Sequence, residues 1–282
     1  MPGSLYLVAT PIGNLDDITL RALHVLREEV SLIACEDTRQ TQKLLQHFEI
    51  RKPLLSYHEH NETQRGAEIL AALARGDSVA LVSDAGTPLV SDPGYRVVSE
   101  AIAHGIPVVP IPGASALLAA LTASGLPVHE FRFAGFLPPK ALARRKMLEH
   151  LAHETTTIVA YESPHRILET LAEMRELLAN ASIVLAREVT KVHEEFLRGS
   201  AAAILEILEA RGAVKGEITL IISPAQEAET GEPLEEVAKL TAAGIERMEA
   251  IKTVAKRLGL PKREVYRLVT EPDSNRPDKR RD

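Results

Sequence analysis

Short apolar runs alternate with helical patterns in the first part of the chain, and this alternation restricts it to few folds. Runs rich in Val, Ile and Leu occur at residues 5–9, 30–34, 53–57, 78–83 and 106–110. Helical segments separate them, such as 63–75, where Ile69 and Leu73 share one face. Strands that alternate with helices form a parallel or mixed sheet covered by helices. The sequence therefore predicts an α/β domain over residues 1–123.

A second set of strand-like runs follows residues 124–130, where Gly and Pro interrupt the pattern. The runs occur at residues 131–136, 155–161, 181–187, 194–198 and 216–223. Trp is absent and aromatic residues make up 4% of the chain, so the core must be built from Leu, Ile, Val and Ala. These residues are the usual filling of parallel sheets. With 282 residues available, we expect a second α/β domain over residues 124–223.

The stretch at residues 79–94 joins an apolar run to a long polar loop. It reads Val-Ala-Leu-Val-Ser-Asp-Ala-Gly-Thr-Pro-Leu-Val-Ser-Asp-Pro-Gly. In parallel α/β proteins, ligands bind beyond the carboxyl ends of the strands, which is where this loop is expected. A purely structural interpretation has Ser91 or Asp92 capping a helix that begins at Pro93. Because that interpretation leaves residues 84–88 unexplained, we favour a ligand-binding loop.

Two other junctions have the same organisation. The apolar run at residues 5–9 is followed by Thr-Pro-Ile-Gly-Asn, in which Gly13 would allow the backbone to approach a ligand closely. The run at residues 108–111 is followed by Pro-Gly-Ala-Ser at residues 112–115 and a helix start rich in small residues. The three junctions together predict a ligand site built from loops at strand ends.

These segments resemble the tetrapyrrole methylase superfamily, and within it the ribosomal RNA branch, the ribosomal RNA small subunit methyltransferase I family. The similarity covers about residues 4–270 in order. The segments that carry it lie at residues 10–17, 34–39, 56–62, 83–94, 112–115, 160–166, 187–191 and 215–220. Because these segments occur in order along nearly the whole chain, chance agreement is not expected.

The resemblance implies two α/β domains with a cleft for S-adenosylmethionine (SAM) between them, and a homodimer. The implied reaction is methylation of the ribose 2′-hydroxyl of a cytidine in the 16S ribosomal RNA of the 30S subunit. SAM would be the methyl donor, with no metal. The expected SAM contacts are Pro11, Gly13, Asp84, Ala85, Gly86, Val90, Ser91, Ser115, Tyr161, Ile218 and Thr219.

Polar residues near predicted strand ends are candidates for the chemistry: Glu36, Asp37, His58, Asn61 and Lys191. A ribose hydroxyl is a poor nucleophile until its proton is accepted or its developing charge is stabilised. His58 or a carboxylate would accept the proton, and Lys191 would stabilise charge. Purely structural roles remain as alternatives, because Asp37 and Asn61 could cap helices and Lys191 could lie on a solvated ion-pair face. His-Glu-His at residues 58–60 could bind a metal, but three convincing ligands are not visible.

Basic residues gather in the C-terminal part, although the net charge of the chain is −6. Residues 247–282 hold 11 Lys and Arg against 6 Asp and Glu. Residues 234–270 have a helix-turn-helix outline, for which a small helical cap is an equal alternative. We expect a linker at residues 224–233 and a disordered tail at 271–282. The candidate RNA contacts are Lys140, Arg144, Arg145, Lys146, Lys256, Arg257, Lys262 and Arg263.

Several classes of protein do not fit the sequence. The single cysteine, Cys35, excludes a disulfide within the chain and a multi-cysteine metal site, and its apolar strand predicts burial. Neither a secretory segment nor a membrane-length apolar run is present, so we expect a cytoplasmic protein without a membrane partner. Nucleotide-binding loops of the P-loop and dinucleotide types are absent. A non-catalytic RNA-binding protein and a methylase for a tetrapyrrole precursor remain as alternatives.

Overall fold

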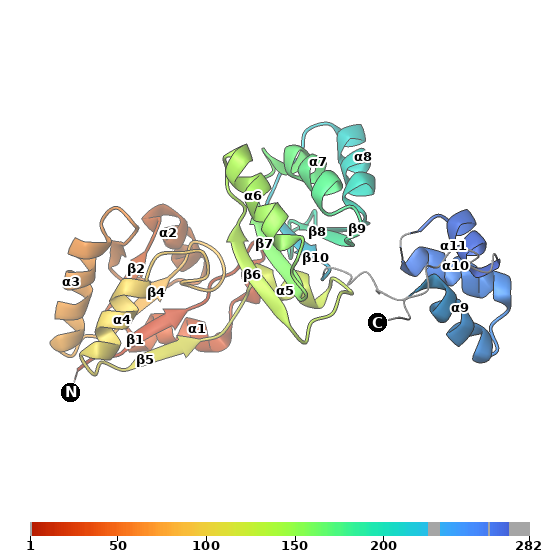
Figure 1. Ribbon diagram of the computed structural model, residues 1–282. Helices are drawn as coiled ribbons and strands as arrows, with labels where there is room; N and C mark the ends of the chain where they lie inside the picture. Colours follow the sequence, from red (N-terminus) through yellow and green to blue (C-terminus); the bar gives the residue numbers. More distant parts are fainter. Residues whose placement is uncertain (1, 225–231, 259, 271–282) are drawn as a thin grey trace. The chain divides into compact units, whose positions relative to one another are not determined.

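The computed structural model describes residues 2–224, 232–258 and 260–270, without the side chains of Lys256 and Arg257. The chain divides into two compact units, residues 1–224 and 225–282. The first unit holds two five-stranded sheets with their helices, and the second holds three helices (Figure 1). The α/β fold with a helical C-terminal appendage that the sequence predicts is therefore confirmed. The division of the first unit at residue 123 remains a prediction.

The first sheet is parallel throughout, in the order β3-β2-β4-β1-β5. Its strands are β1 (Leu5–Val8), β2 (Leu32–Cys35), β3 (Leu54–Ser56), β4 (Val79–Val82) and β5 (Val108–Ile111). Each falls within about two residues of its predicted run. Because the strands are parallel, the loops that follow all five lie at the same edge of the sheet. This edge carries the polar residues that the sequence singles out.

Helices on both faces hold the first sheet. They are α1 (Leu20–His24), which continues as a π turn at Val25–Glu29, α2 (Thr38–His47), α3 (Glu62–Ala74) and α4 (Tyr95–Ala103). The helix that follows β5, α5 (Ala116–Thr122), packs on the second sheet instead. Leu26 and Leu45 pack with Cys35 in one apolar cluster, and Ile69 and Val97 pack in another. Cys35 is fully buried and free, as its apolar strand predicts.

The second sheet is mixed, in the order β6-β7-β10-β8-β9, with only β6 and β7 parallel. Its strands are β6 (Phe131–Phe136), β7 (Thr157–Glu162), β8 (Ile183–Arg187), β9 (Glu195–Gly199) and β10 (Ile218–Ile222). One face is covered by α6 (Ala141–Leu151), α7 (Ile167–Leu177) and α8 (Ala201–Arg211). Leu117 and Leu121 of α5 pack in a cluster with Val159 and Ile221 of this sheet. Helix α5 therefore joins the two sheets into one unit.

Two helices begin later than the sequence predicts. The helix expected from Pro93 starts at Tyr95, after Gly94 with φ +134°, and neither Ser91 nor Asp92 caps it. The sequence also predicts a helix over residues 164–178 with Pro164 in its first turn, but α7 starts at Ile167, since a turn at residues 163–166 precedes it. In the first case the loop continues into the site described below.

The second unit has a small core of its own. It contains α9 (Pro233–Ala242), α10 (Arg247–Arg257) and α11 (Lys262–Thr270). Val237, Ile251, Val254 and Val265 are buried together, so the apolar stripes of the three helices are accounted for by packing within the unit. Most of the predicted linker, and the whole predicted tail at residues 271–282, lie outside the described residues. No helix in the described ranges has the length and apolarity that a membrane span needs.

Candidate functional site

The loops after β1 and β4 are bound to each other through their backbones. Thr10 and Gly86 exchange two backbone hydrogen bonds of 2.9 and 3.0 Å. The hydroxyl of Thr10 donates to the Ser83 carbonyl (3.0 Å), and that of Ser83 donates to the Gly86 carbonyl (2.8 Å). Gly86 has φ +85°, and a Cβ there would lie 3.3 Å from Ile12. A glycine is therefore needed at this position for the two loops to pair.

The loop after β4 contains two further residues in the left-handed region, Leu89 (φ 70°) and Ser91 (φ 67°). This conformation costs energy for residues other than Gly and is found preferentially at functional sites. It turns residues 85–92 across one wall of a cavity. The loop is thus built around a hollow, as the ligand-loop interpretation expects.

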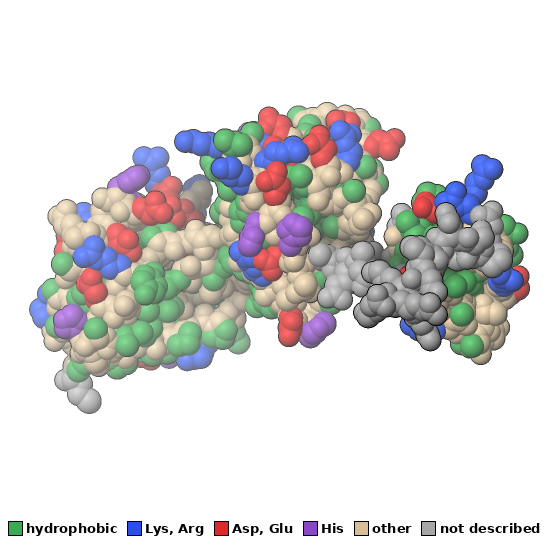
Figure 2. Space-filling model, viewed as in Figure 1, with side chains coloured by type: hydrophobic (Ala, Val, Ile, Leu, Met, Phe, Trp, Pro, Cys, Tyr) green, Lys and Arg blue, Asp and Glu red, His purple; other side chains and the backbone are tan. Residues whose placement is uncertain are grey.

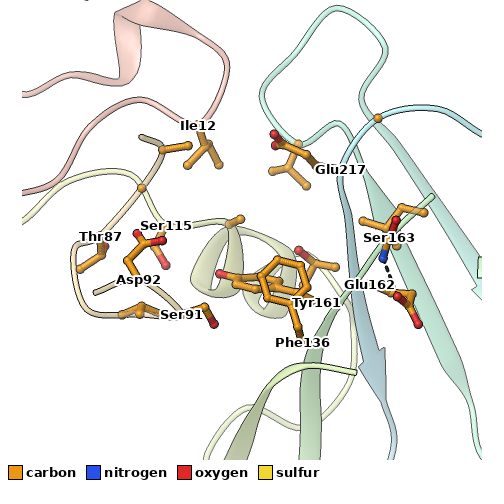
Figure 3. Close-up of a pocket in the computed structure, with 18 of the residues that line it drawn as sticks. Ile12, Thr87, Ser91, Asp92, Ser115, Phe136, Tyr161, Glu162, Ser163 and Glu217 are labelled. Carbon is orange, nitrogen blue, oxygen red and sulfur yellow. Dashed lines mark hydrogen bonds between the residues drawn. The ribbon is translucent and has the colours of Figure 1, made fainter. Parts of the chain in front are cut away.

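The cavity beside this loop is the larger of two neighbouring cavities and has a volume of about 350 Å³ (Figure 3). One part of its lining comes from Ile12, residues 85–87 and 90–92, and α5; the other comes from β6, β7, β10 and the loops beside them. Asp92, Ser91 and Thr87 lie on one side in Figure 3, opposite Ser163, with Tyr161 and Phe136 along the floor. Eight expected SAM contacts line it, namely Ala85, Gly86, Val90, Ser91, Ser115, Tyr161, Ile218 and Thr219. The cavity lies between residues of the two sheets, where the sequence places the cofactor.

The lining of the larger cavity suits a ligand with both aromatic and charged parts. The rings of Phe136 and Tyr161 lie 5.3 Å apart, and Phe136 is largely exposed. Burial, with the nearby charges of Glu36 and Asp84, raises the pKa of Asp92 to about 6, despite a hydrogen bond from Ser83. Glu162 is buried and already accepts hydrogen bonds from Ser163, Arg166 and Thr170, so its role is to stabilise the wall of the cavity. Aromatic rings, backbone groups and a carboxylate fit the adenine, ribose and amino acid parts of SAM.

A second cavity of about 300 Å³ adjoins the first and shares Ile12, Ala85 and Glu217 with it. Three expected SAM contacts, Pro11, Gly13 and Asp84, line this second cavity and are absent from the lining of the first. Its other lining residues are Thr10, Leu15, Gln40, Thr41, Lys43, Leu44, Ser83 and Lys191. The site therefore consists of two neighbouring hollows with different linings.

Lys191 lies across the turn at Gly13. A Cβ on Gly13, which has φ +146°, would lie 2.3 Å from the Lys191 side chain. The space beside Gly13, where the sequence predicts a ligand, is occupied by the side chain of Lys191 from the loop between β8 and β9. This contact ties the first loop of the chain to the second sheet.

Two carboxylates hold the Lys191 ammonium. Its Nζ lies 2.9 Å from Glu188 Oε1 and 3.0 Å from Glu217 Oε2, and Glu188 also accepts from the Glu217 backbone (2.9 Å). Burial acts to lower the pKa of Lys191, but the two carboxylates outweigh it and raise the pKa above the usual value. Gly216 leaves room for this group, since a Cβ there would lie 2.5 Å from Glu188. Lys191 is thus a cation held in a fixed position.

Glu36 and Asp37 lie at the carboxyl edge of the first sheet with other acids. The Asp37 backbone N–H donates to Asp84 Oδ1 (3.0 Å), and Asp37 Oδ1 accepts from Arg39 N (2.8 Å) as the cap of α2. The capping role of Asp37 is therefore confirmed. Burial and the charge of Asp84 raise the pKa of Glu36, and Glu36 lines a narrow recess together with Asp92. Several carboxylates therefore lie at this edge, where their negative charges repel one another.

His58 and Asn61 close a turn after β3. Asn61 Oδ1 accepts from the His58 backbone (2.9 Å), and its Nδ2 donates to the Ser56 carbonyl (3.1 Å) and contacts His58 Nε2 (3.1 Å). Asn61 precedes α3 but makes no side-chain capping bond, so that alternative is wrong. Neither residue lines the two cavities. Within the residues that the structure describes, no three His, Cys, Asp or Glu side chains are grouped to hold a metal.

The candidate RNA contacts differ in exposure. Arg144 is 1% exposed and bonds both oxygens of Glu173 at 2.9 Å, which contradicts its expected place on the surface. Arg145 pairs with Glu176 (2.9 Å), whereas Lys140 and Lys146 are exposed. In the second unit Lys262 and Arg263 are exposed, and the side chains of Lys256 and Arg257 lie outside the described residues.

Some lining residues were not among the sequence candidates. The sequence indicates only a helix cap for Asp92, and it gives no role to Glu217 in the segment at residues 215–220. Both residues lie in segments that the sequence analysis singles out, which is the one sign of a role for them. The residues that surround them in the site belong to other strands, so their environment is not visible in the sequence. Phe136, at the end of β6, carried no distinguishing signal.

Comparison with known proteins agrees with this geometry. The family model of tetrapyrrole (corrin/porphyrin) methylases matches residues 4–205. Ribosomal RNA small subunit methyltransferase I of Halalkalibacterium halodurans (strain ATCC BAA-125 / DSM 18197 / FERM 7344 / JCM 9153 / C-125) is 47% identical over 274 residues, 94% of each chain. The protein of that name from Mesorhizobium japonicum (strain LMG 29417 / CECT 9101 / MAFF 303099) is 49% identical over 271 residues, 95% of this chain and 92% of the relative.

Solved structures share the fold. A conserved hypothetical protein from Aeropyrum pernix K1 matches with a TM-score of 0.60 and 22% identity, over 95% of this chain and 96% of that one. Uroporphyrin-III C-methyl transferase from Thermus thermophilus, complexed with S-adenosyl homocysteine, matches with a TM-score of 0.54 and 21% identity, over 78% and 97%. Because the family model matches most of the chain and the named relatives are 47% and 49% identical to it, the chain belongs to the tetrapyrrole methylase family, in its ribosomal RNA small subunit methyltransferase I group.

Proposed function

We propose that this protein methylates the ribose 2′-hydroxyl of a cytidine in 16S ribosomal RNA, at position 1402 as expected for the group. The relatives' names support a methyltransferase for small-subunit ribosomal RNA. The observation that carries the proposal is the pairing of a cavity suited to SAM with a second, charged cavity that shares its wall. A methyl donor and its acceptor need such adjacent places.

S-adenosylmethionine is the methyl donor, and we place it in the larger cavity. The backbone of the loop at residues 85–92 and that of Ile218 and Thr219 would contact it from two sides. The rings of Tyr161 and Phe136 offer a surface for the adenine, and Ser91, Asp92 and Ser115 offer polar groups. Three of the expected SAM contacts, Pro11, Gly13 and Asp84, line the second cavity and not the first, so they would act from beyond the shared wall.

Bound SAM supplies a methyl carbon on a positive sulfur: the hydroxyl oxygen forms the new C–O bond as the S–C electron pair returns to sulfur, leaving a neutral thioether. The hydroxyl proton must leave to a base. Asp84 lines the second cavity and is suited to accept it. Glu36 and Asp37 line neither cavity and would act through the negative charge they add at this edge of the first sheet. Lys191 is positioned to stabilise charge that develops on the acceptor oxygen. His58 and Asn61 would act by holding the loop after β3.

The proposal extends to the setting of the reaction. The substrate would be 16S ribosomal RNA within the 30S subunit, in the cytoplasm, and the enzyme would act as a homodimer. The relatives' names favour methylation of ribosomal RNA over the two alternatives, a methylase for a tetrapyrrole precursor and a non-catalytic RNA-binding protein.

The test uses SAM with a labelled methyl group and 30S subunits that lack the modification. We expect one label per subunit, resistant to alkaline cleavage at a single cytidine because its 2′-oxygen is blocked. Label on a base, or no label above background with protein that binds SAM, would contradict the proposal. A parallel incubation with uroporphyrinogen III tests the tetrapyrrole alternative directly.

The exposed basic residues of the second unit are proposed to contact ribosomal RNA. Reversing two charges in Lys262→Glu/Arg263→Glu should weaken 30S binding several-fold and reduce its salt dependence, while SAM affinity is unchanged. Filter binding at several salt concentrations measures both quantities. The same salt slope in the variant and the parent protein would show that these residues do not meet phosphates.

A further inference from the structure

The second cavity is lined by groups that match the parts of one nucleotide. We propose that it receives the target nucleotide of the RNA, turned out of its helix and held singly beside the methyl donor. This inference rests on the proposed function and names the binding site of its acceptor. It assigns roles to Leu15, Gln40, Lys43 and Leu44, none of which was a sequence candidate.

The position of the cavity supports this role. It is separated from the larger cavity by Ile12, Ala85 and Glu217, which line both. Reacting atoms must come within about 3–3.5 Å of each other for transfer, so the acceptor must occupy space next to the donor. A hollow of about 300 Å³ has no room for a whole RNA helix, and enzymes that act on a base turn its nucleotide out of the helix because they cannot reach it there.

The lining supplies a different group for each part of a nucleotide. Lys43 is exposed on α2 at the rim, where an ammonium can meet a backbone phosphate. Gln40, whose Oε1 lies 3.2 Å from Lys43 Nζ, has an amide that can bond the polar edge of a base. Leu15 is 37% exposed, and with Leu44 it offers an apolar surface for the face of a base.

The inner part of the cavity is suited to the ribose. Lys191 is held there by its two carboxylates, and Asp84 lines the same hollow. An ammonium and a carboxylate can together bond a hydroxyl, one as donor and one as acceptor. The lining therefore favours a nucleotide.

Two exposed side chains permit a test without disturbing the core. Lys43→Glu and Gln40→Ala should each lower the single-turnover methylation rate on 30S subunits, Lys43→Glu by about tenfold or more, with SAM affinity within twofold of the parent. Arg51→Glu is the matched control, because Arg51 is exposed and lines neither cavity. Parent-like rates in both variants would overturn the inference while leaving the proposed function intact.

Cross-linking gives a second readout that does not need turnover. With p-benzoylphenylalanine in place of Leu15 and S-adenosylhomocysteine present, light should join the protein to 16S RNA at one site, mapped by primer extension. The same change at Ile102, which is 62% exposed on α4, should give no cross-link at that site. A cross-link within two nucleotides of the methylated position supports the inference. No RNA cross-link from position 15, or one elsewhere, overturns it whether or not methylation is observed.

Discussion

The two sheets contribute opposite kinds of chemistry to the site. The parallel first sheet brings the acids Glu36, Asp37 and Asp84 to its carboxyl edge. The mixed second sheet brings a cation, Lys191, together with an aromatic and backbone wall around Tyr161. Partial burial and the charge of Asp84 raise the pKa of Glu36, whereas Glu188 and Glu217 outweigh the effect of burial on Lys191 and raise the pKa of that cation.

The difference shows how each fold positions charge. Parallel strands all end at one edge, so polar residues that follow several of them gather there. Asp37 and Asp84 accept hydrogen bonds from backbone N–H groups, whereas the partners of Lys191 are carboxylates. In the second sheet, Glu188 of the loop between β8 and β9 accepts a hydrogen bond from Glu217, which directly precedes β10. The loop follows this path with Glu188 and Thr190 in the left-handed region. One side therefore holds groups ready to accept protons, and the other holds a fixed positive charge. Three changes test this contrast.

Removing the cation should have the largest effect. Lys191→Met keeps the side-chain stem across Gly13 but loses the charge, so we expect methyl transfer to slow by about a hundredfold, with little change in SAM affinity. Single-turnover rates on 30S subunits and calorimetry measure the two quantities. Lys215→Met, at an exposed lysine before β10, is the control. A rate within a few-fold of the parent protein would mean that the second sheet supplies no catalytic charge.

Disturbing the paired loops of the first sheet should have an intermediate effect. Gly86→Val forces a β-branched residue to φ +85° and crowds Ile12, so SAM affinity should fall about tenfold or more. Stability should also fall, by about 1–2 kcal/mol. Gly105→Val has a similar φ of +69° with nothing within 4 Å, and it should lose stability but keep SAM affinity. Equal SAM affinities in the two variants would place the donor away from this loop.

The smallest effect concerns Asp92 and pH. Its pKa is raised to about 6, so its ionised form is disfavoured in the folded protein, and folding stability should fall as pH rises from about 4 to 6. Asp92→Asn removes this loss. The unfolding free energy of the variant minus that of the parent protein should therefore rise by about 1 kcal/mol over that range and stay constant above it. Urea unfolding at pH 4, 5, 6 and 7 gives the difference; an advantage that does not change with pH would show that Asp92 ionises freely.

Local patterns in the sequence determined the elements of the fold. Apolar runs predicted all ten strands to within about two residues, because strand and helix periodicities are properties of neighbouring residues. The loops at strand ends were also predicted, since a parallel sheet places them together. Five expected SAM contacts from these loops, Ala85, Gly86, Val90, Ser91 and Ser115, line one cavity. The other three in that cavity, Tyr161, Ile218 and Thr219, lie in strands of the second sheet and were implied by the family resemblance.

Only the tertiary structure decided which distant side chains meet. Gly13 accommodates Lys191 from the other sheet, and Glu173 on α7 buries Arg144, which the sequence suggested as an exposed cation. The pKa of Asp92 depends on Glu36 and Asp84, which follow different strands. Periodicity says which face of an element is buried but not what packs against it. Charge pairs, close approaches and raised pKa values arise from packing between elements, so the chemistry of the site became visible only in the folded chain.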